Sequence, residues 1–122
     1  MTAPDAEGGA PSSSPAILMA AGDPGGAAAV LPVARVLAAR GGRPMILDHG
    51  ALGRNAAPEL PRLPPPAEGA ALADWLAERG ISVVCFGTSL ADHLPLALAR
   101  AGRAQGLPVV CVLDNWMNYR AK

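Results

Sequence analysis

Four short apolar runs recur along the chain, and none of them alternates with polar residues. They are AILMAAG from Ala16, PMIL from Pro44, ISVVCF from Ile81 and LPVVCVL from Leu107. A strand with one solvent-exposed face shows strict alternation of apolar and polar residues. A strand of a parallel sheet is buried on both faces and is continuously apolar. The pattern therefore predicts four buried, parallel strands.

Amphipathic segments separate these runs. We predict a first helix in VLPVARVLAARGG, with Pro32 in its first turn, where the missing N–H group costs little. A second helix is predicted in EGAALADWLAERG, with Trp75 packed in the core, and a third from Asp92 to Gln105. The inward positions at helical spacing are Val30, Leu31, Ala34, Leu37, Ala38, Ala71, Leu72, Trp75, Leu76, Leu94, Leu98 and Ala101.

The segment from Ala51 to Ala67 holds five prolines and no periodicity. Long loops without structure are uncommon inside compact domains, so this segment either has a function or covers an edge of the sheet. A short strand within Pro58 to Leu63 is a weaker prediction.

Strands that alternate with helices indicate an α/β fold: a Rossmann-like three-layer sandwich with a mostly parallel sheet of four to five strands. Right-handed crossovers place the first strand between the second strand and the strand at Ile81 to Phe86. Ligands of such sheets bind at the carboxyl ends of the strands, where the order reverses. We assign residues 1–15, rich in Pro, Ser and Gly, to a disordered leader, and residues 16–122 to one Rossmann-like domain.

Charge and composition exclude several classes of function. Ten basic residues balance ten acidic ones, so no broad positive surface for nucleic acid or an anionic membrane is expected. The N-terminus lacks the basic and apolar regions of a signal peptide, and its apolar run is too short for a membrane span. We therefore expect a soluble, cytoplasmic protein. Cys85 and Cys111 lie in apolar runs without metal or redox spacing, which predicts two buried thiols.

Every predicted strand ends in polar residues or glycine at the same edge of the sheet. The proposed ligand cleft consists of Asp23, Gly25, Gly26, Thr88, Ser89, Asp114, Asn115 and Trp116. The glycine turn GDPGGA lacks both GxGxxG spacing and a Walker A ending, so no dinucleotide or other cofactor is predicted. It serves either as a tight turn or as a helix N-terminus that binds an anion. No acidic cluster has metal-ligand spacing, so no bound metal is predicted.

Three further features have alternative interpretations. Asp48 and His49 form either an acid–base pair or a solvated loop, because neighbours at a strand end point in different directions. Thr88 or Ser89 caps the following helix or contacts a ligand, and His93 is a weaker candidate for a catalytic base. Trp116 and Tyr119, near the end of the sequence, stack on a ligand or pack against a partner domain.

The order of these motifs resembles the N-terminal domain of GT-B-fold glycosyltransferases and the related nucleotide-sugar epimerase-like enzymes. The resemblance is carried by ILMAAGDPGGAAAVLPVARVLAARGGRPMIL, by GISVVCFGTS and by GLPVVCVLDNWMNYR, and it covers Ala16 to Arg120. It implies a truncated N-terminal domain that supplies the acceptor side of a cleft. It also implies a sugar or nucleotide-sugar ligand, a missing C-terminal domain or partner chain, and little turnover by this chain alone.

One position departs from the family pattern. Many of these transferases have a catalytic histidine three residues before the helix proline, and that position here is Ala29. The alternative function is a stand-alone binding or regulatory module with a flavodoxin-like sheet. A receiver version of that module is disfavoured, because it requires an acidic pair after the first strand and a lysine after the last.

Overall fold

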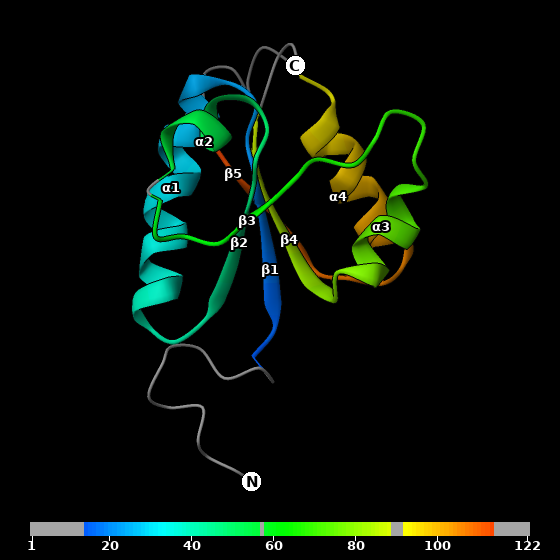
Figure 1. Cartoon of the computed structure of the whole chain (residues 1–122), viewed down its shortest axis with the longest axis horizontal. Helices are drawn as coiled ribbons and strands as arrows, with labels where there is room; N and C mark the ends of the chain where they lie inside the picture. The colour runs from blue at the N-terminus through cyan, green and yellow to red at the C-terminus, as the bar shows by residue number, and fades with distance from the viewer. Residues whose placement is uncertain (1–13, 57, 89–91, 114–122) are drawn as a thin grey trace, which may run out of the picture.

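The computed structural model describes residues 14–56, 58–88 and 92–113 as a five-stranded parallel sheet between two layers of helices (Figure 1). The strands are β1 (Ala16–Ala20), β2 (Arg43–Leu47), β3 (Arg62–Leu63), β4 (Ile81–Gly87) and β5 (Val109–Val112). The helices are α1 (Pro24–Ala39), α2 (Gly50–Asn55), α3 (Leu72–Glu78) and α4 (Leu94–Ala104). The predicted Rossmann-like α/β class is confirmed. Of the predicted leader, only Ser14 and Pro15 are described, and the Ser14 carbonyl accepts a hydrogen bond from Arg43 at 3.0 Å.

The strands lie in the order β3-β2-β1-β4-β5, and every neighbouring pair is parallel. The predicted central place of β1, between β2 and β4, is therefore confirmed. Two strands, β2 and β3, lie on one side of β1, as in the Rossmann order. In the flavodoxin-like order, only one strand lies on that side of β1. The expectation of a flavodoxin-like sheet, attached to the alternative function, is therefore wrong.

Two apolar cores fill the space between the layers. Met19, Ile46 and Leu52 lie in the core beneath α1 and α2, while Leu76 and Leu98 lie in the core beneath α3 and α4. Trp75, at 6% exposure, packs in the second core as predicted. Burial of both sheet faces explains why the central strands are continuously apolar. No helix in the described part of the chain is long and apolar enough to cross a membrane.

Helix α1 begins at Pro24, six residues before the start expected from the periodicity. Pro24 occupies the first turn, after Asp23 in an extended conformation, and Pro32 lies inside the helix. The prediction that Pro32 starts the helix was wrong. A proline inside a helix frees the carbonyl four residues earlier. Here that carbonyl belongs to Ala28, and both residues are exposed, so water can solvate it.

Helix α2 overlaps the proline-rich segment, in which no helix was predicted; the weaker prediction of a short strand there is met by β3. Helix α2 has only six residues, which is too short to be stable by local propensity alone. Tertiary hydrogen bonds hold it: Ala51 N–H donates to Gly22 O at 2.9 Å, and Leu52 N–H donates to Ala21 O at 3.1 Å. Arg62 of β3 donates to the carbonyls of Gly53 and Ala56 at 2.5 and 2.6 Å.

Strand β5 is an edge strand, and its position corrects one prediction. Cys85 of β4 is buried, but Cys111 of β5 is exposed. Both cysteines lie in apolar runs, so sequence alone gives them the same prediction. They differ because β4 has a strand on each side, whereas β5 has a described neighbour only on its β4 side.

Candidate functional site

Three loops converge at the carboxyl edge of the sheet, where the strand order reverses beside β1. One follows β1 at Gly22, another follows β2 at His49 and Gly50, and the third reaches Asp92 before α4. Because all strands are parallel, their carboxyl ends meet at one edge, and this is the edge at which ligands of such folds bind.

The side chains of His49 and Asp92 form a hydrogen bond across this edge. The distance from His49 Nε2 to Asp92 Oδ2 is 2.5 Å, although 43 positions separate the residues in sequence. Their side chains are 30% and 22% exposed, so both are partly shielded and accessible from solvent. The other oxygen, Asp92 Oδ1, accepts the N–H of Leu94 at 3.0 Å. Asp92 therefore caps the first turn of α4 and orients the His49 ring.

Glycine at position 22 makes this pair sterically possible. A Cβ atom at Gly22 would lie 2.0 Å from Asp92 Oδ2, and two non-bonded atoms cannot approach that closely. Gly50, with φ of +64°, approaches the same turn so closely that its Cβ would lie 2.7 Å from Gly22 Cα. The carboxylate of Asp92 thus packs on the bare backbone at the end of β1, with His49 beside it.

The predicted contact between the neighbours Asp48 and His49 was one of two interpretations, and the structure gives them separate partners. Asp48 forms an ion pair with Arg62 at 3.5 Å, while His49 pairs with Asp92. Consecutive residues at a strand end point in different directions, which separates the two side chains. The carboxylate that contacts His49 belongs to Asp92, which is distant in sequence and lies just before α4.

The structure brings part of the predicted cleft together. Asp23, Gly25, Gly26 and Thr88 lie at the carboxyl edge, with Gly25 exposed and Asp23 half-buried. The other four predicted residues, Ser89, Asp114, Asn115 and Trp116, lie outside the described residues, as does Tyr119.

Gly26 has a packing role that the sequence left open. A Cβ atom there would lie 2.7 Å from Thr88 O, and one at Gly87 would lie 2.8 Å from Gly26 O. The first turn of α1 and the end of β4 therefore meet backbone to backbone. Gly26 is buried by this contact, whereas Gly25 remains at the surface of the same turn.

The residues near the start of α4 also differ from expectation. Because α4 begins at Leu94, its first turn is capped by Asp92, and the suggestion that Thr88 caps this helix was wrong. His93 is exposed at the helix boundary and does not share the His49–Asp92 hydrogen bond.

Cys85 does not have the properties of a thiol nucleophile, and no metal-binding cluster is found in the described residues. Burial, together with the nearby Cys111, raises the pKa of Cys85 to about 11. Cys85 is therefore a protonated, unreactive thiol at neutral pH. Within residues 14–56, 58–88 and 92–113, no group of three or more His, Cys, Asp or Glu side chains could hold a metal ion.

Asp92 is the residue of the candidate site that sequence reasoning missed. The sequence pattern placed it only at the start of the third predicted helix, from Asp92 to Gln105. A sequence signal existed, since Asp92 follows the third long strand and His49 follows the second, and parallel strands end at one edge. Their pairing depends on the close approach of both loops at Gly22.

Comparison with known proteins does not extend this description: no family model, curated protein or solved structure matches the chain.

Proposed function

We propose that this chain supplies the acceptor-side half of a glycosyltransferase or nucleotide-sugar-processing enzyme, with His49 as its general base. The observation that carries the proposal is the hydrogen-bonded His49–Asp92 pair at the carboxyl edge, beside the point where the strand order reverses. The resemblance to GT-B enzymes contributes the substrate class. His49 takes the role that the family pattern would give to position 29, where this chain has alanine.

The chemistry follows from the pair. In the tautomer that donates Nε2–H to Asp92, Nδ1 of His49 is the basic nitrogen. It removes the proton from an acceptor hydroxyl as that oxygen attacks the anomeric carbon of the sugar. A carbon–oxygen bond forms, the bond from that carbon to the phosphate breaks, and the phosphate leaves with the electron pair. The Asp92 carboxylate stabilises the resulting imidazolium, which is the usual role of a carboxylate behind a catalytic histidine.

The first turn of α1 supports a phosphorylated ligand at the same edge. Gly25 is exposed there, and the N-terminal N–H groups of this 16-residue helix favour negative charge. Asp23 precedes that turn and opposes a phosphate placed directly beside it. We therefore place the phosphate over Gly25 and the sugar toward His49.

The two histidines of the chain provide a matched test. The protein is titrated with UDP-N-acetylglucosamine, and the ring resonances of His49 and His93 are followed by NMR, with His49→Gln and His93→Gln to assign them. We expect the resonances of His49 to shift and those of His93 to stay in place. Loss of the Asp92 acceptor in Asp92→Ala should mix the His49 tautomers, which the ring nitrogen shifts report.

Two results would contradict the proposal. One is the absence of any His49 response at millimolar nucleotide-sugar, and the other is an equal response at His93. The assignment to an acceptor-side half has its own test, since robust glycosyl transfer or epimerisation by this 122-residue chain would overturn it.

A further inference from the structure

Three of the four exposed large apolar residues of the described chain lie on β5, directly after it or on α4 beside it, and the fourth lies on α1, which also contacts β5. They are Val36 of α1, Leu96 of α4, Val110 of β5, and Leu113, each 40–50% exposed. Large apolar side chains clustered in this way mark an interaction surface, whereas single ones are ordinary. We call this surface the β5 edge.

The backbone of β5 is oriented to accept another strand. Val84 N–H donates to Pro108 O at 3.1 Å, so residues 108, 110 and 112 direct their backbone groups toward β4. Val109, between them, directs its N–H and C=O groups outward. No described strand lies on that side. A parallel sheet edge of this kind is a template for strand addition.

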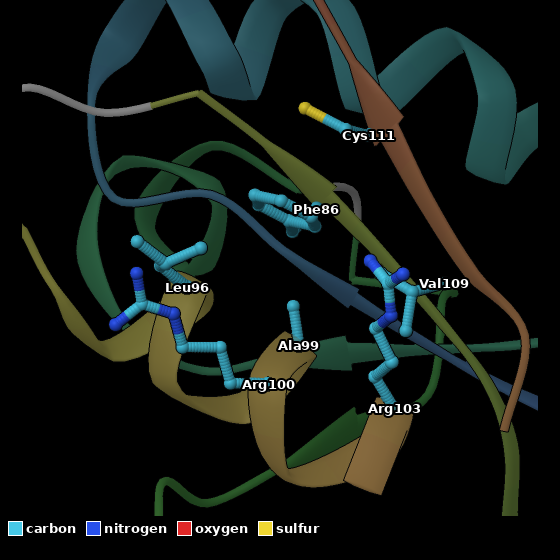
Figure 2. Close-up of a pocket in the computed structure, with 7 residues that line it drawn as sticks. All are labelled: Phe86, Leu96, Ala99, Arg100, Arg103, Val109 and Cys111. Atoms are coloured by element: carbon cyan, nitrogen blue, oxygen red, sulfur yellow. The ribbon is translucent and has the colours of Figure 1, made fainter. Parts of the chain in front are cut away.

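The two faces of the β5 edge have different chemistry. On the α4 face, a groove of about 330 Å³ is lined by Phe86, Leu96, Ala99, Arg100, Arg103, Val109 and Cys111. Figure 2 shows both arginines coming from α4, opposite Phe86 of β4 and Val109 of β5. None of the described residues that line this groove is acidic. On the other face, Pro32, Val33, Val36 and Leu37 of α1 form a purely apolar hollow.

We propose that the β5 edge binds an extended strand of a separate protein, in which glutamate and aliphatic residues alternate. Side chains alternate between the faces of a sheet, so one set would face the arginines and the other would face α1. Glutamate fits the first set, because its methylene groups cover Leu96 and Val109 while its carboxylate reaches Arg100 or Arg103.

A second copy of this chain fits the edge less well. Antiparallel pairing of two β5 strands about a two-fold axis perpendicular to the sheet would place both α4 helices on the same face. Arg100 and Arg103 of one copy would then approach the same two arginines of the other, and like charges in contact oppose association.

The probe is the peptide acetyl-Val-Glu-Val-Glu-Val-Glu-Val-amide, and its control has lysine in place of each glutamate. Binding to the full chain is measured by fluorescence anisotropy of labelled peptides and by backbone NMR shifts. We expect the glutamate peptide to bind, with shifts confined to β5, α4 and α1. Arg100→Glu/Arg103→Glu should weaken binding by about tenfold or more, because two ion pairs become repulsive.

The matched control is Arg40→Glu/Arg54→Glu, which changes the net charge equally at two exposed sites, the C-cap of α1 and the last turn of α2. It should leave binding within about twofold, with circular dichroism confirming that both variants are folded. Val110→Asp should also weaken binding, because it places a charge where the aliphatic side chains of the peptide would pack on the α1 face. Equal binding of both peptides, no binding at millimolar peptide, or self-association that Val110→Asp abolishes would overturn the proposal.

Discussion

The two halves of the sheet, on either side of β1, finish their outer edges differently. Strand β3 has only two residues, and prolines precede and follow it at Pro61 and Pro64. Strand β5 is twice as long, with four residues and no charge, and a proline, Pro108, lies only before it. Proline and short length discourage further pairing, whereas a longer apolar edge invites it. The sequence of β3 therefore disfavours pairing with a further strand, whereas the sequence of β5 allows it.

The arginines of the two halves also have different surroundings. Arg62 fastens β3 to α2 by two short hydrogen bonds to carbonyl groups. On the opposite side, Arg100 and Arg103 line an open groove beside β5. Arginine therefore stabilises the fold in one half and is available for recognition in the other. The His49–Asp92 pair links the halves across the end of β1.

The largest effect is expected where the halves meet. In Gly22→Ala, the new methyl group would overlap Asp92 and push its loop away from His49. We expect a loss of about 3 kcal/mol in the free energy of unfolding, measured by urea denaturation. The same substitution in an Asp92→Gly background should cost much less, because all three atoms nearest to that Cβ belong to Asp92. An equal cost in both backgrounds would show that the overlap is not the cause.

The next effect contrasts arginines of the two halves. Arg62→Ala should lower the free energy of unfolding by about 2 kcal/mol, since two carbonyl acceptors lose a charged donor. Arg103→Ala, at an exposed position, should change it by no more than about 0.5 kcal/mol. Thermal and urea denaturation of both variants measure the difference. Similar losses of free energy of unfolding in both variants would show that Arg103 stabilises the fold as much as Arg62 does.

The buried thiol of β4 predicts a smaller, pH-dependent effect. The folded-state pKa of Cys85, about 11, lies above the ordinary cysteine value of 9.0, so the unfolded chain releases the proton first as pH rises. The contribution is present below about pH 9 and declines toward about pH 11. Between about pH 8 and about pH 10 it should lower the free energy of unfolding by about 1 kcal/mol.

Urea denaturation at both pH values, compared with Cys85→Ala, isolates this term, because the alanine variant lacks the thiol. Cys111→Ala provides the counterpart on the exposed strand. A pH dependence that persists in Cys85→Ala would assign it to other groups.

The smallest effect is expected at the open edge. Val110→Thr replaces a side chain that is 49% exposed, so the free energy of unfolding should change by less than about 0.5 kcal/mol. Val84→Thr, at a fully buried position on the neighbouring strand, should cost several times more, since it places a hydroxyl group in the core. Equal costs in calorimetry would indicate that Val110 is covered in solution.

The sequence predicted the strands, the α/β class and the central position of β1, because parallel strands buried on both faces leave continuous apolar runs. It missed α2, whose six residues are held by hydrogen bonds to Gly22, Ala21 and Arg62 rather than by periodicity. It also placed the start of α1 too late, since glycines are poor helix formers. Gly26 is nevertheless helical, and its missing side chain permits the contact with Thr88.

For the site, sequence alone determined that polar residues and glycine gather at the carboxyl edge, because strand polarity is fixed by the fold class. Only the tertiary structure decided which of them meet. His49 pairs with Asp92 rather than with its neighbour Asp48, and Cys111 is exposed while Cys85 is buried. Chain order specifies the edge, but side-chain partners depend on how closely separate loops approach, and that distance is set by packing at Gly22.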